Sequence, residues 1–279
     1  MGNRPASTAH LAMLLEVAGT PKPGNVDRHR DLSDLGFEHF LAGAVGARPG
    51  LVAAATGDRV GAAFETAIAG MAAATDRNTH FGTLLLLVPL VAATDDGTIA
   101  PAATERVVED TTIADAADFY RAFDHVEVAV GDPPADAPDL DVRRGSDAVS
   151  AVESRGLTLL DVMERSTPGD GVAREWTTGF ERTFETAERI RSGDGSILDR
   201  AADAFLALLA RDPDTLVQTR HGEAVAREVT DRAASLEDGS REAIEAFAAD
   251  LVDRGINPGT TADVTAAGLY VALTRGASL

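Results

Sequence analysis

The sequence predicts an all-α fold: a single compact multi-helix domain over residues 1–279, with one irregular Pro/Asp-rich loop near residues 131–145. Three observations lead to this prediction. Apolar residues recur at helical spacing along almost the whole chain. Hydrophobic residues make up 44% of it, which is enough for a sizeable core. Aromatic residues make up only 5%, so small aliphatic side chains must build that core.

The first half of the chain contains helical patterns bounded by typical start and stop residues. They span residues 7–19, 34–50, 59–76, 79–94 and 101–123. The second of them ends in Gly-Ala-Arg-Pro-Gly, where proline favours the end of a helix. Residues 79–94 are almost entirely apolar, which predicts a buried, central helix. Residues 101–123 predict either one helix or two that are broken near Thr111–Thr112.

The middle of the chain is less regular. Residues 125–130, HVEVAV, alternate strictly between apolar and polar, but one short strand cannot form a sheet, so they are either a strand or a helix end. The Pro/Asp-rich residues 131–145 predict a functional loop or a covering flap. The second half resumes helical patterns at residues 146–154, 158–166, 171–192, 196–211, 221–237, 240–254 and 260–275.

The charge balance is strongly acidic. Asp and Glu number 45 against 25 Lys and Arg, and the net charge of −20 is spread along the chain. Salt screens such self-repulsion, because the Debye length falls to about 3 Å at 1 M. We therefore expect a cytoplasmic protein of a salt-accumulating, haloarchaeal type of organism. The same field makes non-specific nucleic-acid binding improbable.

Several classes of protein are excluded or disfavoured. The chain has no cysteine, so disulfides, thiolate metal sites and a cysteine nucleophile are excluded. The N-terminus lacks the pattern of a signal peptide. The longest apolar run, residues 84–93, is shorter than the ~20 residues that cross a bilayer, so no membrane association is expected. P-loop, dinucleotide-fingerprint, HExxH, GxSxG and EF-hand patterns do not occur.

Lys22 is the only lysine of the chain and lies in GTPKPGNVDR, residues 19–28. Two prolines and Gly24 make a rigid turn that can fix the directions of the polar side chains Lys22, Asn25, Asp27 and Arg28. The alternative is an ordinary helix stop. We favour a functional role for Lys22, because arginine satisfies a generic surface charge but cannot replace a compact ammonium group at a tight site.

Four further segments carry polar residues that simple helix turns do not require. They are DRNTHFG (76–82), GDGVAREWTTGF (169–180), DPDTLVQTRHG (212–222) and NPGTTADVTAAG (257–268). The first begins the most apolar helix, where free backbone amides can bind an anion. The structural alternatives are helix caps at 76–82 and 257–268, a solvated helix face at 169–180, and a turn or linker at 212–222.

In this order, the five segments resemble the triphosphoribosyl-dephospho-coenzyme A synthase family over residues 7–275. The family pattern E-x3-TPKPG-x-VDR is seen as Glu16 and TPKPGNVDR. Its N-T-H-x-G segment, preceded by a glutamate-bearing helix, is seen as Glu65 and NTHFG. The other three segments appear as VAREWTTGF, DTLVQTRHG and INPGTTAD.

The resemblance implies an all-helical enzyme that uses ATP and dephospho-coenzyme A. A ribose hydroxyl of the acceptor attacks C1′ of ATP, adenine leaves, and the triphosphate stays on the transferred ribose. The product is the precursor of the prosthetic group of citrate lyase or malonate decarboxylase. The substrates are small molecules, and a homodimer is compatible with the resemblance.

The resemblance also implies roles for individual residues. Glycosyl transfer needs an acid and a carboxylate that stabilises an oxocarbenium-like state, and the triphosphate brings Mg²⁺. The catalytic candidates are His80, Asp27, Glu65 and Asp263, with His80 favoured as the acid or hydroxyl-activating group because histidine titrates nearest neutrality. The Mg²⁺ candidates are Asp27, Glu65 and Asp214. The substrate-binding candidates are Lys22, Gly24, Asn25, Arg28, Asn78, Thr79, Arg174, Asp214, Arg220, Gly259 and Thr260.

The chain departs from the family pattern at three places. A G-A-H-x-D-M stretch is replaced by DRHRDLSDL, a lysine after N-T-H is replaced by Phe81, and the last segment has PGTTAD instead of PGGSAD. These departures indicate a divergent branch. Two alternatives to triphosphoribosyl transfer follow: another nucleotide-dependent enzyme of kinase or ligase type, and a non-catalytic nucleotide-binding protein.

Overall fold

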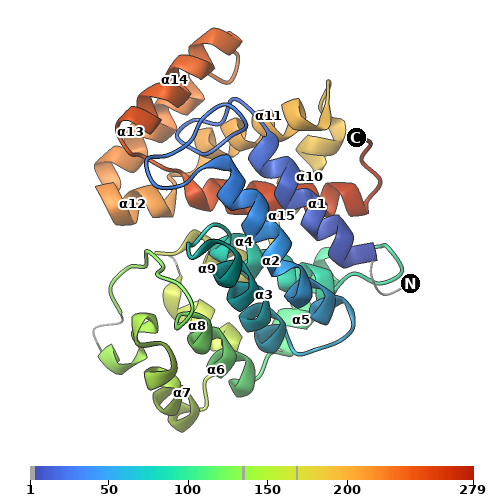
Figure 1. Ribbon diagram of the computed structural model, residues 1–279, viewed down its shortest axis with the longest axis vertical. Helices are drawn as coiled ribbons and strands as arrows, with labels where there is room; N and C mark the ends of the chain where they lie inside the picture. The colour runs from blue at the N-terminus through green and yellow to red at the C-terminus, as the bar shows by residue number, and fades with distance from the viewer. Residues whose placement is uncertain (1–3, 134–135, 168) are drawn as a thin grey trace.

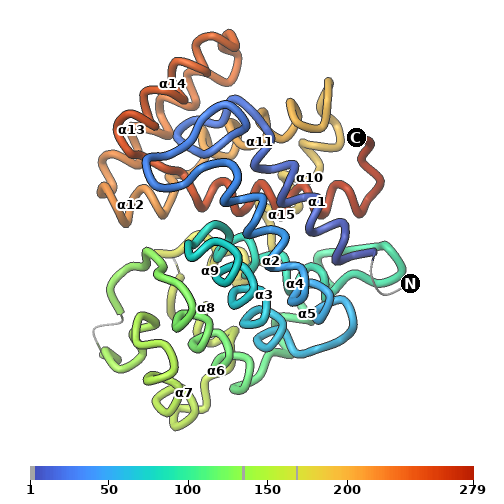
Figure 2. The backbone as a smooth tube through the Cα atoms, viewed as in Figure 1, coloured from blue at the N-terminus to red at the C-terminus, as the bar shows by residue number. Residues whose placement is uncertain are grey.

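The computed structural model describes residues 4–133, 136–167 and 169–279 (Figures 1 and 2). Across these ranges the regular elements are helices, and β structure is limited to two isolated bridges, so the all-α prediction is confirmed. In the first half, the helices are α1 (Arg4–Ala18), α2 (Phe37–Ala55), α3 (Val60–Thr75), α4 (Phe81–Ala92), α5 (Pro101–Glu109) and α6 (Ile113–Ala122).

The second half begins with two 3-10 helices, η1 (Pro138–Leu140) and η2 (Val142–Ala148). The α-helices that follow are α7 (Val149–Arg155), α8 (Leu159–Ser166), α9 (Gly171–Thr177), α10 (Glu181–Ser192), α11 (Ile197–Arg211), α12 (Thr215–His221), α13 (Glu223–Ala234), α14 (Arg241–Asp253) and α15 (Gly259–Thr274).

Helices α4 and α15 lie at the centre of the molecule. Ten residues of α4 are buried, which confirms that the apolar segment forms a central helix. Helix α15 is buried almost all round and packs against α1, α4, α10 and α11 (Figure 1). A smaller apolar cluster joins α11 to α14 and includes Phe205, Val217, Phe247 and Leu251. Helix α15 therefore lies between the large core and the smaller apolar cluster.

Helices α2 and α3 approach each other through small residues. A side chain on Gly46 would lie 2.3 Å from the carbonyl oxygen of Gly70, and one on Gly50 would meet Ala67 at 2.4 Å. The predicted stop at Pro49 is wrong, because α2 continues through it to Ala55. Pro49 is exposed, so water can bind the carbonyl oxygen that proline leaves without a helical donor.

Two other predicted helices differ in the structure. Residues 171–192 form two helices, because Gly179 and Phe180 both have left-handed φ angles, of 65° and 61°. The turn buries Phe180 completely and redirects the chain into α10, which packs on α15. The segment 101–123 is broken as its second alternative stated, and the side chain of Thr112 caps α6.

Residues 127–133 have no regular structure, and His125 and Val126 before them lie in the turn after α6. The predicted segment 125–130 therefore forms no strand, and only its start belongs to a helix end. Its apolar alternation is nevertheless visible, since Val126, Val128 and Val130 are half-buried while Glu127 and Ala129 are exposed. The segment is an extended stretch that packs one face on the protein without a partner strand. The predicted irregular loop continues into η1 and η2, and its residues 134–135 lie outside the described residues.

The apolar helices of the chain are short. Among the described residues, none has both the length and the apolar character needed to span a membrane.

Candidate functional site

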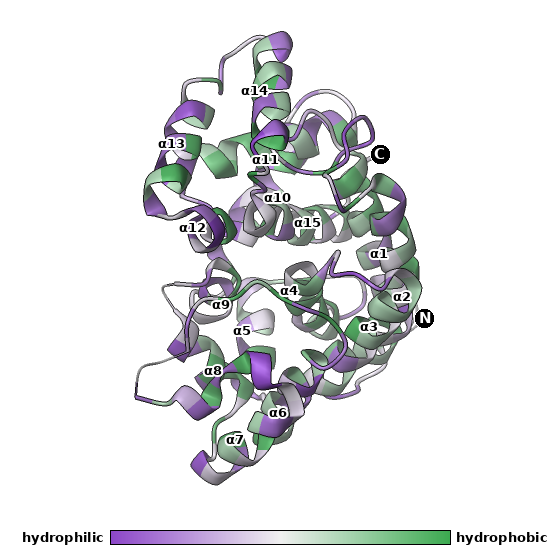
Figure 3. Cartoon of the chain, turned by 60° about the vertical axis from the view of Figure 1, so that its left-hand side comes forward, coloured by the Kyte–Doolittle hydropathy of each residue, from purple (hydrophilic) through white to green (hydrophobic). Residues whose placement is uncertain are grey.

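A cavity of about 470 Å³ lies between two groups of helices. It is lined by residues of α6, α8 and α12 and of the starts of α9 and α15. Figure 3 shows α12 and α15 in one group of helices and α6, α8 and α9 in the other. The start of α4, Glu16 of α1 and the irregular stretch 127–133 complete its wall. The volume is within the ~300–1,000 Å³ range of small-molecule sites.

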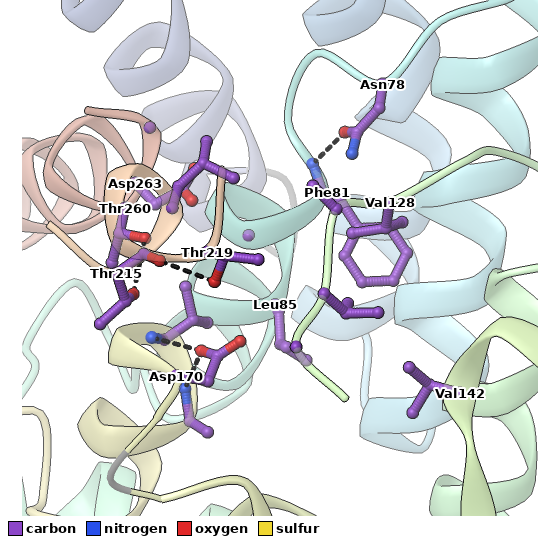
Figure 4. A pocket seen from close by; sticks show the side chains of 18 of the residues that line it. Asn78, Phe81, Leu85, Val128, Val142, Asp170, Thr215, Thr219, Thr260 and Asp263 are labelled. Atoms are coloured by element: carbon purple, nitrogen blue, oxygen red, sulfur yellow. Dashed lines mark hydrogen bonds between the residues drawn. The ribbon is translucent and has the colours of Figure 1, made fainter. Parts of the chain in front are cut away.

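The cavity has a polar part and an apolar part (Figure 4). Asp170, Thr215, Thr219, Thr260 and Asp263 gather on one side of the view. Phe81, Leu85, Val128 and Val142 lie toward the other side, where Phe119 and Phe123 also line the wall. Such a division suits a ligand with both charged and uncharged portions.

Asp263 is held at the junction of α15 and α4. Its Oδ1 accepts a hydrogen bond of 2.6 Å from the hydroxyl of Thr83. Its Oδ2 lies over Gly82, where a side chain would come within 2.1 Å of that oxygen. Glycine is therefore needed in NTHFG so that this carboxyl group can approach the helix.

The environment of Asp263 favours the protonated form. The side chain is half-buried and lines the cavity. This burial raises the pKa of Asp263 to about 8, and the charges of Asp214, Glu16 and Asp170 add to the effect, while the bond from Thr83 opposes it. Asp263 can therefore hold a proton near neutral pH.

Glu16 is the second carboxyl group of the inner wall. It is 5% exposed, and its Oε1 accepts a bond of 2.5 Å from Nζ of Lys22, which itself is 1% exposed. Lys22 also donates to Oδ1 of Asn25 over 3.2 Å, and Asn25 donates to Oδ1 of Asn257 over 2.9 Å. Glu16, Asn25 and Asn257 line the cavity, whereas Lys22 lies behind them.

Asp27 fixes the TPKPGNVDR turn from inside. It is fully buried and accepts hydrogen bonds from the hydroxyl of Thr20, the backbone amides of Lys22 and His29, and the guanidinium of Arg30. Gly24, with a φ of 72°, lies so close to the carbonyl oxygen of Ile256 that a side chain would meet it at 2.2 Å. These contacts shape the turn behind the cavity wall.

Asp214 joins the starts of two helices. Its Oδ1 accepts from the amides of Leu216 and Val217 in α12, and its Oδ2 accepts from the amide and hydroxyl of Thr261 in α15. Burial raises the pKa of Asp214, and these four bonds oppose the shift. The carboxylate thus locks α12 against α15 and does not face the cavity.

Three helix starts are tied together at the polar side of the cavity. The hydroxyl of Thr215 accepts from the amide of Gly171 over 3.0 Å and lies 3.0 Å from the hydroxyl of Thr260. Asp170 caps α9 through Oδ1, which accepts from the amides of Val172 and Ala173. This network brings three of the predicted segments together at one edge of the cavity.

His80 lies where α4 begins and lines the cavity, but it is only 3% exposed. Its Nδ1 is 2.8 Å from the hydroxyl of Thr79, and its ring packs edge-on against Phe40. Burial lowers the pKa of His80 to about 3, with the charge of Lys22 adding to the effect. The expectation that this histidine titrates near neutrality is therefore not met, and its imidazole is neutral.

Eight of the predicted site residues line the cavity: Asn25, Asn78, Thr79, His80, Arg220, Gly259, Thr260 and Asp263. The others lie outside it: Lys22, Gly24, Asp27, Arg28, Glu65, Arg174 and Asp214. Arg28 donates to the carbonyl oxygen of Ala18, Arg174 lies 3.7 Å from Asp212, and Glu65 lies 3.7 Å from the ring of His125. Helix α9 is instead fastened by Glu175, which is fully buried and paired with Arg182.

The charges around the cavity are mostly negative. Arg165 and Arg220 are the cationic side chains among the described lining residues. They face a larger number of acidic ones, namely Glu16, Asp34, Glu127, Asp132, Asp141, Asp170 and Asp263. A polyanionic ligand in this cavity needs cations of its own to offset that field.

Several lining residues were not singled out as site candidates. Glu16 appeared only as the first letter of the E-x3-TPKPG pattern, which was the available signal for it. Gly82 and Thr83 lie beside Asp263. Their role in the site comes from contact with this residue, which is 180 positions from Thr83 in the sequence. Arg165 carries no pattern that distinguishes it from other helix-surface arginines.

Comparison with known proteins gives a consistent result. The family model described as CitG, ATP:dephospho-CoA triphosphoribosyl transferase, matches residues 2–278. Among solved structures, the chain is similar to a protein from Archaeoglobus fulgidus that is assigned as a triphosphoribosyl-dephospho-coA synthase. The two share 27% identity with a TM-score of 0.73, over 87% of this chain and 100% of the other. A search of curated proteins returned no match.

The five sequence segments thus converge on one cavity, and the family match covers almost the whole chain. The chain belongs to the CitG family, the ATP:dephospho-CoA triphosphoribosyl transferases.

Proposed function

We propose that the cavity transfers the 5-triphosphoribosyl group of ATP to a ribose hydroxyl of dephospho-CoA and releases adenine. One observation carries the proposal: two carboxyl groups in different environments face the same cavity. Glu16 is paired with a lysine, whereas among the described residues Asp263 has a hydroxyl partner and no cationic one. Burial raises the pKa of both groups, but only Glu16 has a cation that opposes the shift. Two carboxyl groups in different environments are a common basis of acid–base catalysis.

The transfer requires one bond to break and one to form at C1′ of ATP. The bond from C1′ to adenine breaks, and its electron pair leaves with the base. The acceptor oxygen forms the new bond to C1′ and loses its proton. Asp263 is suited to protonate the departing adenine. Its pKa of about 8 means that the carboxyl group still carries its proton at neutral pH.

The polar side of the cavity supports a site for the triphosphate. Arg220 of α12 and Arg165 of α8 are exposed cations that line the cavity, and neither has an ion pair among the described residues. Thr215 and Thr219 add hydroxyl groups on the side of Arg220. We assign the triphosphate to the space between the two arginines.

Mg²⁺ fits this arrangement through Asp170. Its Oδ1 caps α9, and its Oδ2 accepts no hydrogen bond from the described residues. Mg²⁺ is usually held by one or two carboxylates together with substrate phosphates, and it neutralises phosphate charge. The earlier candidates fit less well, since Asp27 and Asp214 already accept several hydrogen bonds and Glu65 does not line the cavity.

The apolar side of the cavity supports binding of the uncharged portions of the substrates. Phe81 and Phe123 lie 4.7 Å apart between ring centres, and Phe119 packs edge-on against Phe123. Apolar and aromatic surfaces bind flat bases and aliphatic chains by burial and dispersion. Residues 127–133 line the cavity, and residues 131–133 belong to the segment 131–145, for which a functional loop or a covering flap stays a prediction.

Adenine is the diagnostic product. Purified protein is incubated with ATP, Mg²⁺ and dephospho-CoA over a range of potassium chloride concentrations, and the products are separated by chromatography. We expect adenine and a triphosphoribosylated acceptor in equal amounts, and none without dephospho-CoA. Formation of ADP or AMP instead would overturn the proposal and indicate a kinase or ligase.

The cellular setting follows from the substrates. ATP and dephospho-CoA are cytoplasmic metabolites, so we place the protein in the cytoplasm. The homodimer stays a prediction, which light scattering of the purified protein decides.

A further inference from the structure

Lys22, the only lysine of the chain, is turned away from the substrate space. It is 1% exposed, and its ammonium group is enclosed by Glu16, by Asn25 and by the ring of Phe205, whose centre is 5.9 Å away. A side chain enclosed in this way cannot reach a phosphate group in the cavity. Its effect on the cavity must pass through the residues that it touches.

Both polar partners of Lys22 line the cavity. Its ammonium group lies 2.5 Å from Oε1 of Glu16 and 3.2 Å from Oδ1 of Asn25. Since Asn25 uses its oxygen for Lys22, its amide nitrogen is directed to Asn257, before α15. The ammonium group of Lys22 thus fixes the carboxylate of Glu16 on α1. Through Asn25 it also orients the side chain of Asn257, which is 232 positions from Asn25.

This geometry also explains why arginine does not occupy position 22. The enclosed space holds a compact ammonium group with two oxygen partners on different elements. The planar guanidinium group is larger and directs its donors in a fixed fork. An arginine here would have to displace Glu16 or Phe205.

The titratable groups around Glu16 belong to three elements. Lys22 and Asp27 belong to the turn, Asp263 belongs to α15, and His80 of α4 is uncharged. Burial raises the pKa of Glu16 and Asp27 raises it further, whereas Lys22 opposes both. Lys22 is therefore the group that favours an ionised Glu16.

We propose that Glu16 is a catalytic residue that takes the proton from the attacking hydroxyl of the acceptor, and that Lys22 is the positioning residue that orients it. This inference rests on the proposed transfer reaction. The hydroxyl oxygen forms its bond to C1′ as its proton moves to an oxygen of Glu16, while Asp263 gives its proton to adenine. The two carboxyl groups then exchange protons with water, so each turnover leaves the enzyme unchanged.

The test compares Glu16→Gln and Lys22→Met with the wild type, using adenine release as a function of pH. Ionised Glu16 sets the acidic side of the profile. We expect Lys22→Met to lower kcat about tenfold or more and to move the acidic side up by about one pH unit, with little change in KM for ATP. Glu16→Gln should lower kcat further and remove the acidic side, and the double variant should be no worse than Glu16→Gln.

The outcomes separate the possible roles. A rise in KM for ATP in Lys22→Met, with kcat and the pH profile unchanged, would make Lys22 a phosphate ligand and overturn the inference. Unchanged kinetics of Glu16→Gln would also overturn it, and this near-isosteric variant decides the matter if Lys22→Met does not fold. Glu153→Gln, on the exposed part of α7, controls for loss of a negative charge. If the wild type releases no adenine, the transfer reaction itself has failed instead.

Discussion

Three carboxyl groups behind the cavity wall differ from two of those in the wall by the number of hydrogen bonds that they accept. Asp27 and Asp214 each accept four, and Glu175 accepts three. Glu16 and Asp263 each accept one from the described residues. The first three, the framework carboxylates, use their oxygens to fix turns and helix starts. The other two, the wall carboxyls, keep an oxygen for a reacting group.

This contrast separates carboxylates that stabilise the fold from carboxyl groups that can transfer a proton. A carboxylate surrounded by donors stabilises the folded chain, because buried charge is tolerated when its hydrogen bonds are complete. A carboxyl group with few donors in the same interior has a shifted pKa and can transfer a proton. The following predictions test whether the two groups really differ in this way.

The largest expected effect is the loss of catalysis in Asp263→Asn. The amide has the same shape and can still accept a bond from Thr83, but it cannot donate an acidic proton to adenine. We expect adenine release to fall about 10²- to 10⁴-fold while the protein stays folded. Asp147→Asn, at an exposed position, is the control. Full activity of Asp263→Asn would show that a different group protonates adenine.

The pKa of Asp263 predicts a pH dependence as well. Activity should fall as the pH rises through about 8, because the acid loses its proton. The stability of the folded protein should also fall as the pH rises. An aspartate ionises near 3.8 when it is unfolded and near 8 in this site, so between these values the unfolded state binds fewer protons. Rising pH therefore lowers the free energy of unfolding.

Both parts of this pH prediction can be measured on one pair of proteins. Thermal unfolding of the wild type and of Asp263→Asn is compared across the range, together with adenine release by the wild type. The pH dependence of stability that comes from Asp263 should be absent in the variant. The melting temperature of the variant should therefore rise relative to that of the wild type as the pH rises. Parallel curves would mean that Asp263 ionises normally in the folded protein.

Asp214→Ala tests the framework carboxylates and should act mainly on stability. The change leaves four donors at the starts of α12 and α15 without their acceptor. Loss of such caps should lower the free energy of unfolding by about 3 kcal/mol. Urea unfolding measures this, and Asp147→Ala is the control. A stable but inactive Asp214→Ala protein would move Asp214 into the group of wall carboxyls.

Gly82→Ala should affect both properties by a smaller amount. The new methyl group would overlap Oδ2 of Asp263, so the carboxyl group must move out of place. Overpacking costs about 1–3 kcal/mol in stability, and we expect kcat to fall about tenfold or more.

Gly46→Ala is a matched control for this change. It creates an equally close contact between α2 and α3, away from the cavity. We expect a lower melting temperature with unchanged kcat. An equal loss of kcat in both variants would attribute the effect to general strain rather than to Asp263.

The smallest effect is expected from Arg220→Gln at the edge of the cavity. Loss of one exposed phosphate contact should raise KM for ATP about tenfold, or ~1.4 kcal/mol, and leave kcat nearly unchanged. The difference should shrink at high salt, because exposed charges are screened. Arg227→Gln, on the exposed face of α13, is the control. A large fall in kcat with constant KM would place Arg220 at the reacting atoms instead.

The sequence by itself determined the fold class, the family and the five segments of the site. Helical periodicity depends on neighbours within a few positions, so α4 and α15 could be predicted from local pattern. The unusual composition of each segment, such as one lysine between two prolines, predicted which parts of the chain contribute to the site. The continuation of α2 through Pro49 and the break at Phe180 could not be predicted in this way, because exposure and packing against distant helices decide them.

The tertiary structure alone decided which residue of each segment faces the cavity. In the first segment it enclosed Lys22 and Asp27, and it placed Asn25 and the nearby Glu16 of α1 in the cavity wall. It also set the proton affinities, raising the pKa of Asp263 and lowering that of His80. These properties depend on burial and on partners such as Thr83, 180 positions from Asp263, which no local pattern specifies.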